Sequence, residues 1–121
     1  MIAYIQYHKM KLVQHKFTLP QLKKYDITQK VIEALADAES RAIIFTTIKK
    51  GKTAYDLAET LKIPLSSVYK KLTDLENLTL IQVEKYVTTD SGRRLKIYRS
   101  RIKKADIIIK NKEPEIQLSA N

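Results

Sequence analysis

Hydrogen-bonding and cationic side chains gather in two short stretches of the chain. The first holds Ser66, Ser67, Tyr69, Lys70 and Lys71, and the second holds Arg93, Arg94 and Lys96. Ammonium groups attract phosphate, and hydroxyl groups bond to phosphate oxygens or base edges. Arginine is always charged, and it forks onto phosphate or enters a narrow minor groove. These residue types favour contact with a nucleic acid.

Two helices should position the first stretch. Thr53 can cap a helix, and Asp56 three positions later completes a capping box. Pro64 disfavours helical geometry at Ile63, so this helix should end there. A second apolar stripe at helical spacing begins at once and predicts a helix over residues 65–77. Helices joined by about three residues cross steeply, which is the geometry of a helix-turn-helix.

A two-stranded ribbon should position the second stretch. Apolar and polar residues alternate over residues 81–87, and Asp90-Ser91-Gly92 is a turn signal. Leu95 and Ile97 resume the alternation, with Lys96 and Tyr98 expected on the opposite face. This pattern puts Arg93 and Arg94 at the tip of the hairpin.

A resemblance follows from these motifs. The run Ile63-Pro64-Leu65-Ser66-Ser67-Val68-Tyr69-Lys70-Lys71-Leu72, then Leu75-Glu76 and Leu80-Ile81, resembles the recognition helix of winged helix-turn-helix transcriptional regulators. It is most similar to the small ArsR-like or MarR-like type of archaea and bacteria, and it covers roughly residues 30–101. Thr79 departs from the pattern, since such proteins often have glycine there.

The resemblance implies a mainly α fold with a β-wing (α+β), the winged helix-turn-helix. It also implies a sequence-specific regulator that binds double-stranded DNA as a homodimer. Helix 65–77 would enter the major groove, and wing 88–96 would lie on the backbone or minor groove. The eight residues of the two stretches are the expected DNA contacts, with Tyr69 either exposed or half-buried against the wing.

The charge distribution supports this interpretation. The chain has 121 residues and a formal net charge of +10. Residues 26–60 carry five basic and six acidic side chains, whereas residues 61–112 carry thirteen basic and five acidic ones. A uniformly solvated basic surface would not leave the first of these regions neutral, so the positive charge is concentrated where a nucleic acid should bind.

The chain lacks the residues that several other classes of function need. The chain has no cysteine, which excludes disulfides and thiolate metal sites. His8 and His15 are its only histidines, and its two glycines form no phosphate-binding loop. We therefore expect no enzyme activity, metal or cofactor. No apolar run is long enough to span a membrane and no secretory signal pattern is present, so a cytoplasmic protein is expected.

We expect three regions in the chain. Residues 1–25 would form a basic and apolar arm that packs in a dimer or touches DNA, with packing favoured. Residues 26–104 would form the DNA-binding domain, whose first helix begins at Asp26 or Thr28. Its second helix should run from about Ala38 to Lys50, where Gly51 stops it. Residues 105–121 should form a β-hairpin that packs on its own domain or builds a dimer interface.

Two other functions fit the same fold. One is a protein–protein interaction module of a transcription or replication assembly, and the other is an RNA-binding winged helix. A DNA-binding protein should show its recognition face and wing as one positive surface, whereas an interaction module should be apolar or acidic there. The sequence does not indicate the operator, the sign of regulation or any small-molecule effector.

Overall fold

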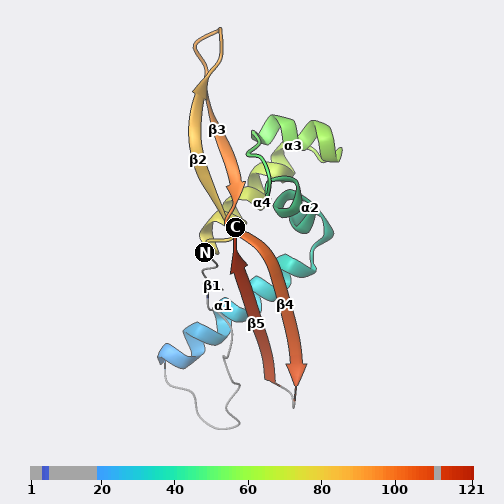
Figure 1. Ribbon diagram of the computed structural model, residues 1–121, viewed down its shortest axis with the longest axis vertical. Coiled ribbons are helices and arrows are strands. Elements are labelled where there is room, and N and C mark those ends of the chain that lie inside the picture. The colour runs from blue at the N-terminus through green and yellow to red at the C-terminus, as the bar shows by residue number, and fades with distance from the viewer. Residues whose placement is uncertain (1–3, 6–18, 111–112) are drawn as a thin grey trace.

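The computed structural model describes residues 4–5, 19–110 and 113–121, with side chains described within 27–109 and 114–121. Its helices are α1 (Leu19–Ala36), α2 (Ala38–Thr46), α3 (Ala54–Leu61) and α4 (Leu65–Asn77). Its strands are β1 (Tyr4–Ile5), β2 (Ile81–Thr88), β3 (Arg94–Ser100), β4 (Ile102–Lys110) and β5 (Glu113–Ala120) (Figure 1). Both histidines and most of the expected N-terminal arm lie outside the described residues.

The helix pair α3–α4 forms where local signals predicted it. The Thr53 hydroxyl accepts from the Asp56 amide at 3.0 Å, and the Asp56 carboxylate accepts from the Thr53 amide at 3.1 Å, so the capping box is confirmed. Helix α3 ends at Leu61, and Lys62 turns the chain with a φ of 58°. Helix α4 then begins at Leu65, directly after Pro64.

The first two helices differ from their predicted bounds. Helix α1 begins at Leu19, upstream of Asp26, with Pro20 in its first turn, where the missing amide hydrogen is tolerated. Helix α2 ends at Thr46 rather than near Lys50. The Thr47 hydroxyl donates to the Ile43 carbonyl at 2.9 Å and so satisfies a carbonyl at the helix end.

Gly51 has a different role from the predicted helix stop. It lies beyond α2, where Lys52 forms a backbone bridge to Tyr98 of β3. A Cβ atom at Gly51 would lie only 2.5 Å from Cγ2 of Ile97 and 3.2 Å from the Tyr98 carbonyl oxygen. The close approach of this segment to β3 therefore requires glycine.

The wing is the antiparallel hairpin of β2 and β3 with its connecting residues 89–93. A register shift between Val83 and Lys85 interrupts the simple alternation of β2. Tyr98 pairs with Val83 and is buried, whereas Lys96, two positions earlier in β3, is exposed. Burial raises the pKa of the Tyr98 phenol, with the negative charge of Glu76 as a second cause.

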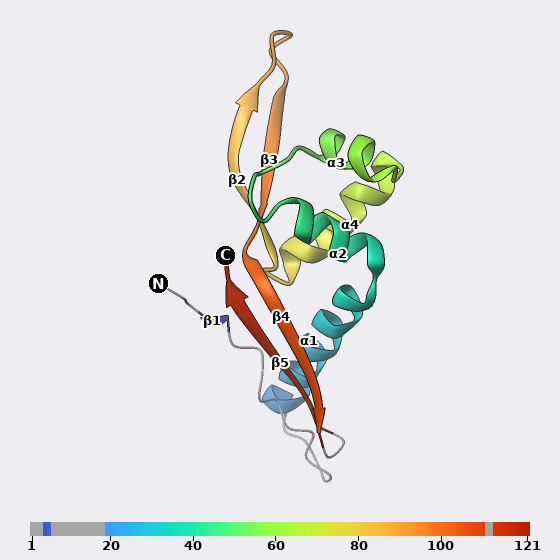
Figure 2. The ribbon, with the colours of Figure 1, turned by 45° about the vertical axis from the view of Figure 1, so that its right-hand side comes forward.

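A second sheet has the strand order β1-β5-β4. The predicted C-terminal hairpin is confirmed, although β4 starts earlier than expected, at Ile102. Ile116 and Leu118 of β5 are fully buried in one core with Val31 and Leu35 of α1, so this hairpin packs on its own chain. Helix α1 runs along this sheet (Figure 2). The described part of β1 pairs with β5.

The wing and the second sheet point in opposite directions along the molecule (Figure 1). Helices α2, α3 and α4 lie on one side of the wing (Figure 1), and the core runs through these helices and both sheets. Among the described residues, no helix has the length and apolar character needed to cross a membrane.

Candidate nucleic-acid interface

Helix α4 presents a polar face opposite its buried stripe. Val68, Leu72 and Leu75 are buried, whereas Ser66, Tyr69, Lys70 and Thr73 are exposed and Ser67 is half-buried at the edge. Pro64 precedes the helix and supplies no side-chain hydrogen bond to its first turn. The amide groups of that turn are thus available to an anion, which the helix dipole also favours.

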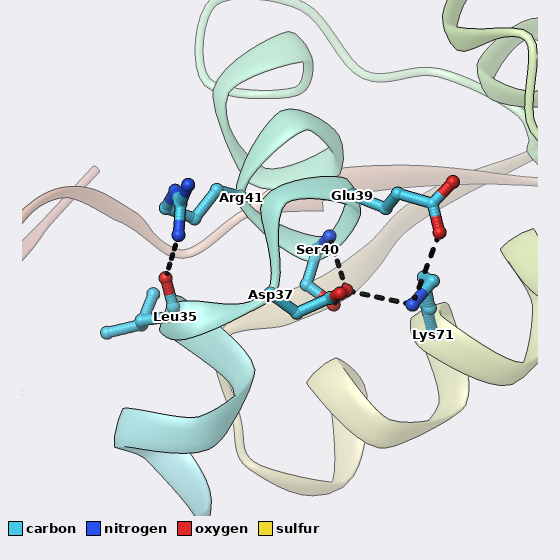
Figure 3. A network of polar contacts seen from close by, with 6 residues as sticks. All are labelled: Leu35, Asp37, Glu39, Ser40, Arg41 and Lys71. Atoms are coloured by element: carbon cyan, nitrogen blue, oxygen red, sulfur yellow. Dashed lines mark hydrogen bonds and ion pairs between the residues drawn. The ribbon is translucent and has the colours of Figure 1, made fainter.

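Lys71 lies apart from this exposed face, in a network of polar contacts at the junction of α1 and α2 (Figure 3). Its ammonium group donates to the Asp37 carboxylate at 2.8 Å and lies 3.6 Å from the Glu39 carboxylate. Asp37 also caps α2 by accepting from the Ser40 amide at 3.0 Å and from the Ser40 hydroxyl at 2.8 Å.

The network perturbs the titration of both partners. The hydrogen bond from Lys71, followed by those from Ser40, lowers the pKa of Asp37 to about 2. The same hydrogen bond to Asp37 raises the pKa of Lys71. Both groups are therefore charged at neutral pH, and they tie the start of α2 to the middle of α4. Asp37 lies 34 positions from Lys71, so no local pattern in the sequence indicates this contact.

Two arginines near the tip of the wing are each held against a tyrosine ring. The Arg93 guanidinium lies 4.7 Å from the ring centre of Tyr55 in α3 and donates a hydrogen bond to its hydroxyl. The Arg94 guanidinium lies 3.9 Å from the ring centre of Tyr86 in β2. These cation–π contacts limit the motion of two long side chains while leaving them exposed.

A groove separates α4 from the wing and brings half of the predicted residues together. Tyr69, Arg93, Arg94 and Lys96 line it, and its volume is about 300 Å³. Tyr55 lines it as well and meets Tyr69 edge to face, with ring centres 6.5 Å apart. Sequence reasoning missed Tyr55, since its contact with Arg93 spans 38 positions.

The cations along this groove are available to a ligand. Glu76 also lines the groove. Among the described side chains, no carboxylate forms an ion pair with Arg93, Arg94 or Lys96 of the groove, or with Lys70 on the exposed face of α4. Arg99 differs, because its guanidinium binds the Glu84 carboxylate at 2.7 Å and the Ile48 carbonyl at 3.0 Å. The described part of the chain holds no group of three or more histidine, cysteine or acidic residues that could bind a metal.

A solved structure has the same arrangement of helices and wing. It is the crystal structure of NolR from Sinorhizobium fredii, which matches with a TM-score of 0.54 at 15% sequence identity. The match covers 72% of this chain and 81% of NolR. The chain has a winged helix-turn-helix fold. The predicted α+β fold class is thereby confirmed, with the hairpin of β2 and β3 as the wing.

Comparison by sequence adds no closer relationship. No protein-family model and no curated protein matches the chain. At 15% identity, the likeness to NolR concerns the winged-helix fold. This likeness therefore assigns no ligand-binding residue to the chain.

Proposed function

We propose that this protein is a cytoplasmic transcriptional regulator that binds double-stranded DNA with sequence specificity, as a homodimer. Helix α4 would enter the major groove, and the tip of the wing, residues 88–96, would contact the backbone or minor groove. The winged-helix fold supports this proposal, because it is a fold of DNA-binding transcription regulators.

One observation carries the proposal. The exposed face of α4 and the arginine pair of the wing border the same groove, and the groove's cations have no described carboxylate partner. A helix in the major groove leaves the adjacent sugar-phosphate strand beside it. That strand would occupy the groove between α4 and the wing, where Arg93, Arg94 and Lys96 would meet its phosphates.

The residues of α4 would make different contacts with the DNA. Ser66, Lys70 and Thr73 lie at the centre of the exposed face and would read base edges, with Lys70 the strongest candidate for guanine. Ser67 and Tyr69 lie toward its sides and would contact phosphate. Lys71 would act indirectly, because its ammonium group is held by Asp37 and Glu39 and fixes the orientation of α4.

Selection of bound duplexes from a random pool tests this function. We expect a near-palindromic consensus, with half-sites about one helical turn apart. Lys70→Ala should relax the consensus at the position that it reads, whereas Arg93→Ala/Arg94→Ala should weaken binding to all duplexes alike. Lys62→Ala, at the exposed end of α3, serves as the control for removal of one positive charge. An unenriched pool would contradict sequence-specific binding.

A further inference from the structure

A largely apolar trough lies between α2 and β4. Both elements lie away from the wing tip (Figures 1 and 2). Leu35, Ile44, Ile102, Ala105 and Ile107 line a hollow of about 150 Å³ there. Phe45 also lines the hollow, with 63% of its surface exposed, and Ile109 further along β4 is 77% exposed. Large apolar side chains exposed together in this way mark an interaction surface.

The strand that borders the trough is open along one edge. Strand β4 is the outer strand in the order β1-β5-β4, and its second edge pairs with no strand in the described part of the chain. An open edge offers unpaired amide and carbonyl groups to another strand. The run of three isoleucines, residues 107–109, makes this edge strongly disposed to pair.

The trough provides both parts of a reciprocal contact, a hollow and an aromatic ring at its rim. A cavity of about 150 Å³ accommodates one benzene-sized ring. Phe45 provides such a ring at the rim of a hollow of that volume. In a two-fold dimer the same patch meets itself, so each Phe45 can enter the hollow of the other copy.

The charges of β4 fit the same symmetry. Lys104 and Asp106 flank Ala105 and form an exposed ion pair at 3.6 Å. If two β4 strands pair antiparallel about Ala105, each lysine faces the partner subunit's Asp106, and each aspartate faces the partner subunit's Lys104. The small side chain of Ala105 lies at the two-fold axis, where two backbones come closest.

We propose that the trough between α2 and β4 is the homodimer interface of this protein, formed by antiparallel β4–β4 pairing and by reciprocal insertion of Phe45. The inference rests on the proposed dimeric regulator and names its interface. This interface leaves the wing of each copy free, since the wing and the β4–β5 hairpin extend toward opposite ends of the molecule (Figure 1).

Sedimentation of the full chain at a series of micromolar concentrations tests the apolar contact. Phe45→Glu should weaken the dimer at least about a hundredfold, because a symmetric dimer loses two buried rings. Tyr86→Glu is the matched control, with the same change of an exposed aromatic residue on the wing. The control should remain as dimeric as the wild type. A Phe45→Glu chain that stays equally dimeric would place the interface elsewhere and overturn the inference.

A mixing experiment tests the symmetry, with circular dichroism of each variant showing beforehand that it is folded. Lys104→Glu alone sets two acidic groups opposite each other across the axis, and Asp106→Lys alone sets two lysines opposite each other. Each variant should therefore dimerise about tenfold more weakly than the wild type. An equal mixture should restore the dimer as a heterodimer, because both cross-axis pairs then have opposite charge. The repulsion within each chain persists in the mixture, so recovery reports the interface alone.

The outcomes separate this inference from the proposed function. A mixture that fails to recover, or a wild-type chain that sediments as a monomer, overturns the interface. The latter result would assign the trough to an acidic partner, since Arg41 and Lys103 also line it. Binding of a short duplex is measured in parallel by fluorescence anisotropy. Dimers that behave as expected but bind no duplex would support the interface and contradict the DNA-binding function.

Discussion

Tyr55 holds Arg93 at the edge of the groove by two contacts, through its ring and through its hydroxyl. A free arginine loses several rotamers when it binds phosphate, whereas one already held against a ring loses fewer. Tyr55→Ala should therefore weaken duplex binding about two- to fivefold, which corresponds to the free energy of an exposed cation–π contact. Fluorescence anisotropy measures this change, and Tyr55→Phe should fall between the wild type and the alanine variant.

A double-mutant cycle separates this role from a general effect of the substitution. If Tyr55 acts through Arg93, then Tyr55→Ala should add nothing in a chain that already carries Arg93→Ala. Tyr86→Ala is the control, because Tyr86 stacks on Arg94 and its effect should add to that of Arg93→Ala. Additive effects of Tyr55 and Arg93 would count against the positioning role.

Thr79 occupies a backbone conformation that suits glycine. Its φ is 60°, in the left-handed region, where a β-branched residue is strained. Thr79→Gly should raise the free energy of unfolding by roughly 0.5–1 kcal/mol, since relief of strain exceeds the extra flexibility of the unfolded chain. Urea denaturation measures it. Thr88→Gly, in a strand with ordinary φ, should instead destabilise the protein.

Among the elements, the junction of α1 and α2 is coupled to α4 by the ion pair of Asp37 and Lys71. The pKa of Asp37 is lowered from 3.8 to about 2, so its stabilisation is complete above pH 3.8 and disappears as the pH falls toward 2. The side chain of Asp37 is 40% exposed, so solvent screening limits the effect to no more than about 1 kcal/mol.

Thermal unfolding between pH 4 and pH 2 tests this coupling. Asp37→Asn keeps a residue that can cap α2 but removes the titrating carboxylate. Its stability should therefore fall less steeply in acid than that of the wild type. Asp90→Asn, on the wing where the described structure gives it no ion pair, should leave the slope unchanged. Equal slopes for the Asp37 variant and the wild type would contradict the coupling.

Sequence signals that act within a few residues predicted the helices and strands that border the groove. Contacts between residues far apart in the sequence could not be predicted. Thr53 and Pro64 fixed the bounds of α3 and α4, because capping and proline geometry act locally. The register shift between Val83 and Lys85 was not predicted, since a bulge leaves no clear mark in an alternating pattern. Lys71 and Asp37 meet only through the packing of α4 against α2.

The whole molecule separates its proposed DNA contacts from its proposed dimer contacts. The groove carries Arg93 and Arg94, which have no described carboxylate partner, and the trough between α2 and β4 carries exposed apolar side chains. If each copy offers its own groove cations, a dimer presents them twice to one duplex. The number of phosphates that the protein neutralises therefore depends on the groove, which binds them, and on the trough, which joins the two copies. The salt dependence of binding thus reports whether both copies bind the duplex.

If the dimer neutralises roughly six to ten phosphates, raising the salt from about 50 to about 200 mM should lower duplex affinity about a thousandfold or more, because binding releases counterions. Anisotropy titrations at several salt concentrations give the slope of the logarithm of the affinity against the logarithm of the salt concentration. The monomeric Phe45→Glu chain should show about half the slope of the wild type, since only one copy then binds the duplex. Arg93→Ala/Arg94→Ala should flatten the slope by roughly one for each phosphate that is no longer neutralised. A wild-type affinity that does not change with salt would contradict electrostatic binding through this groove.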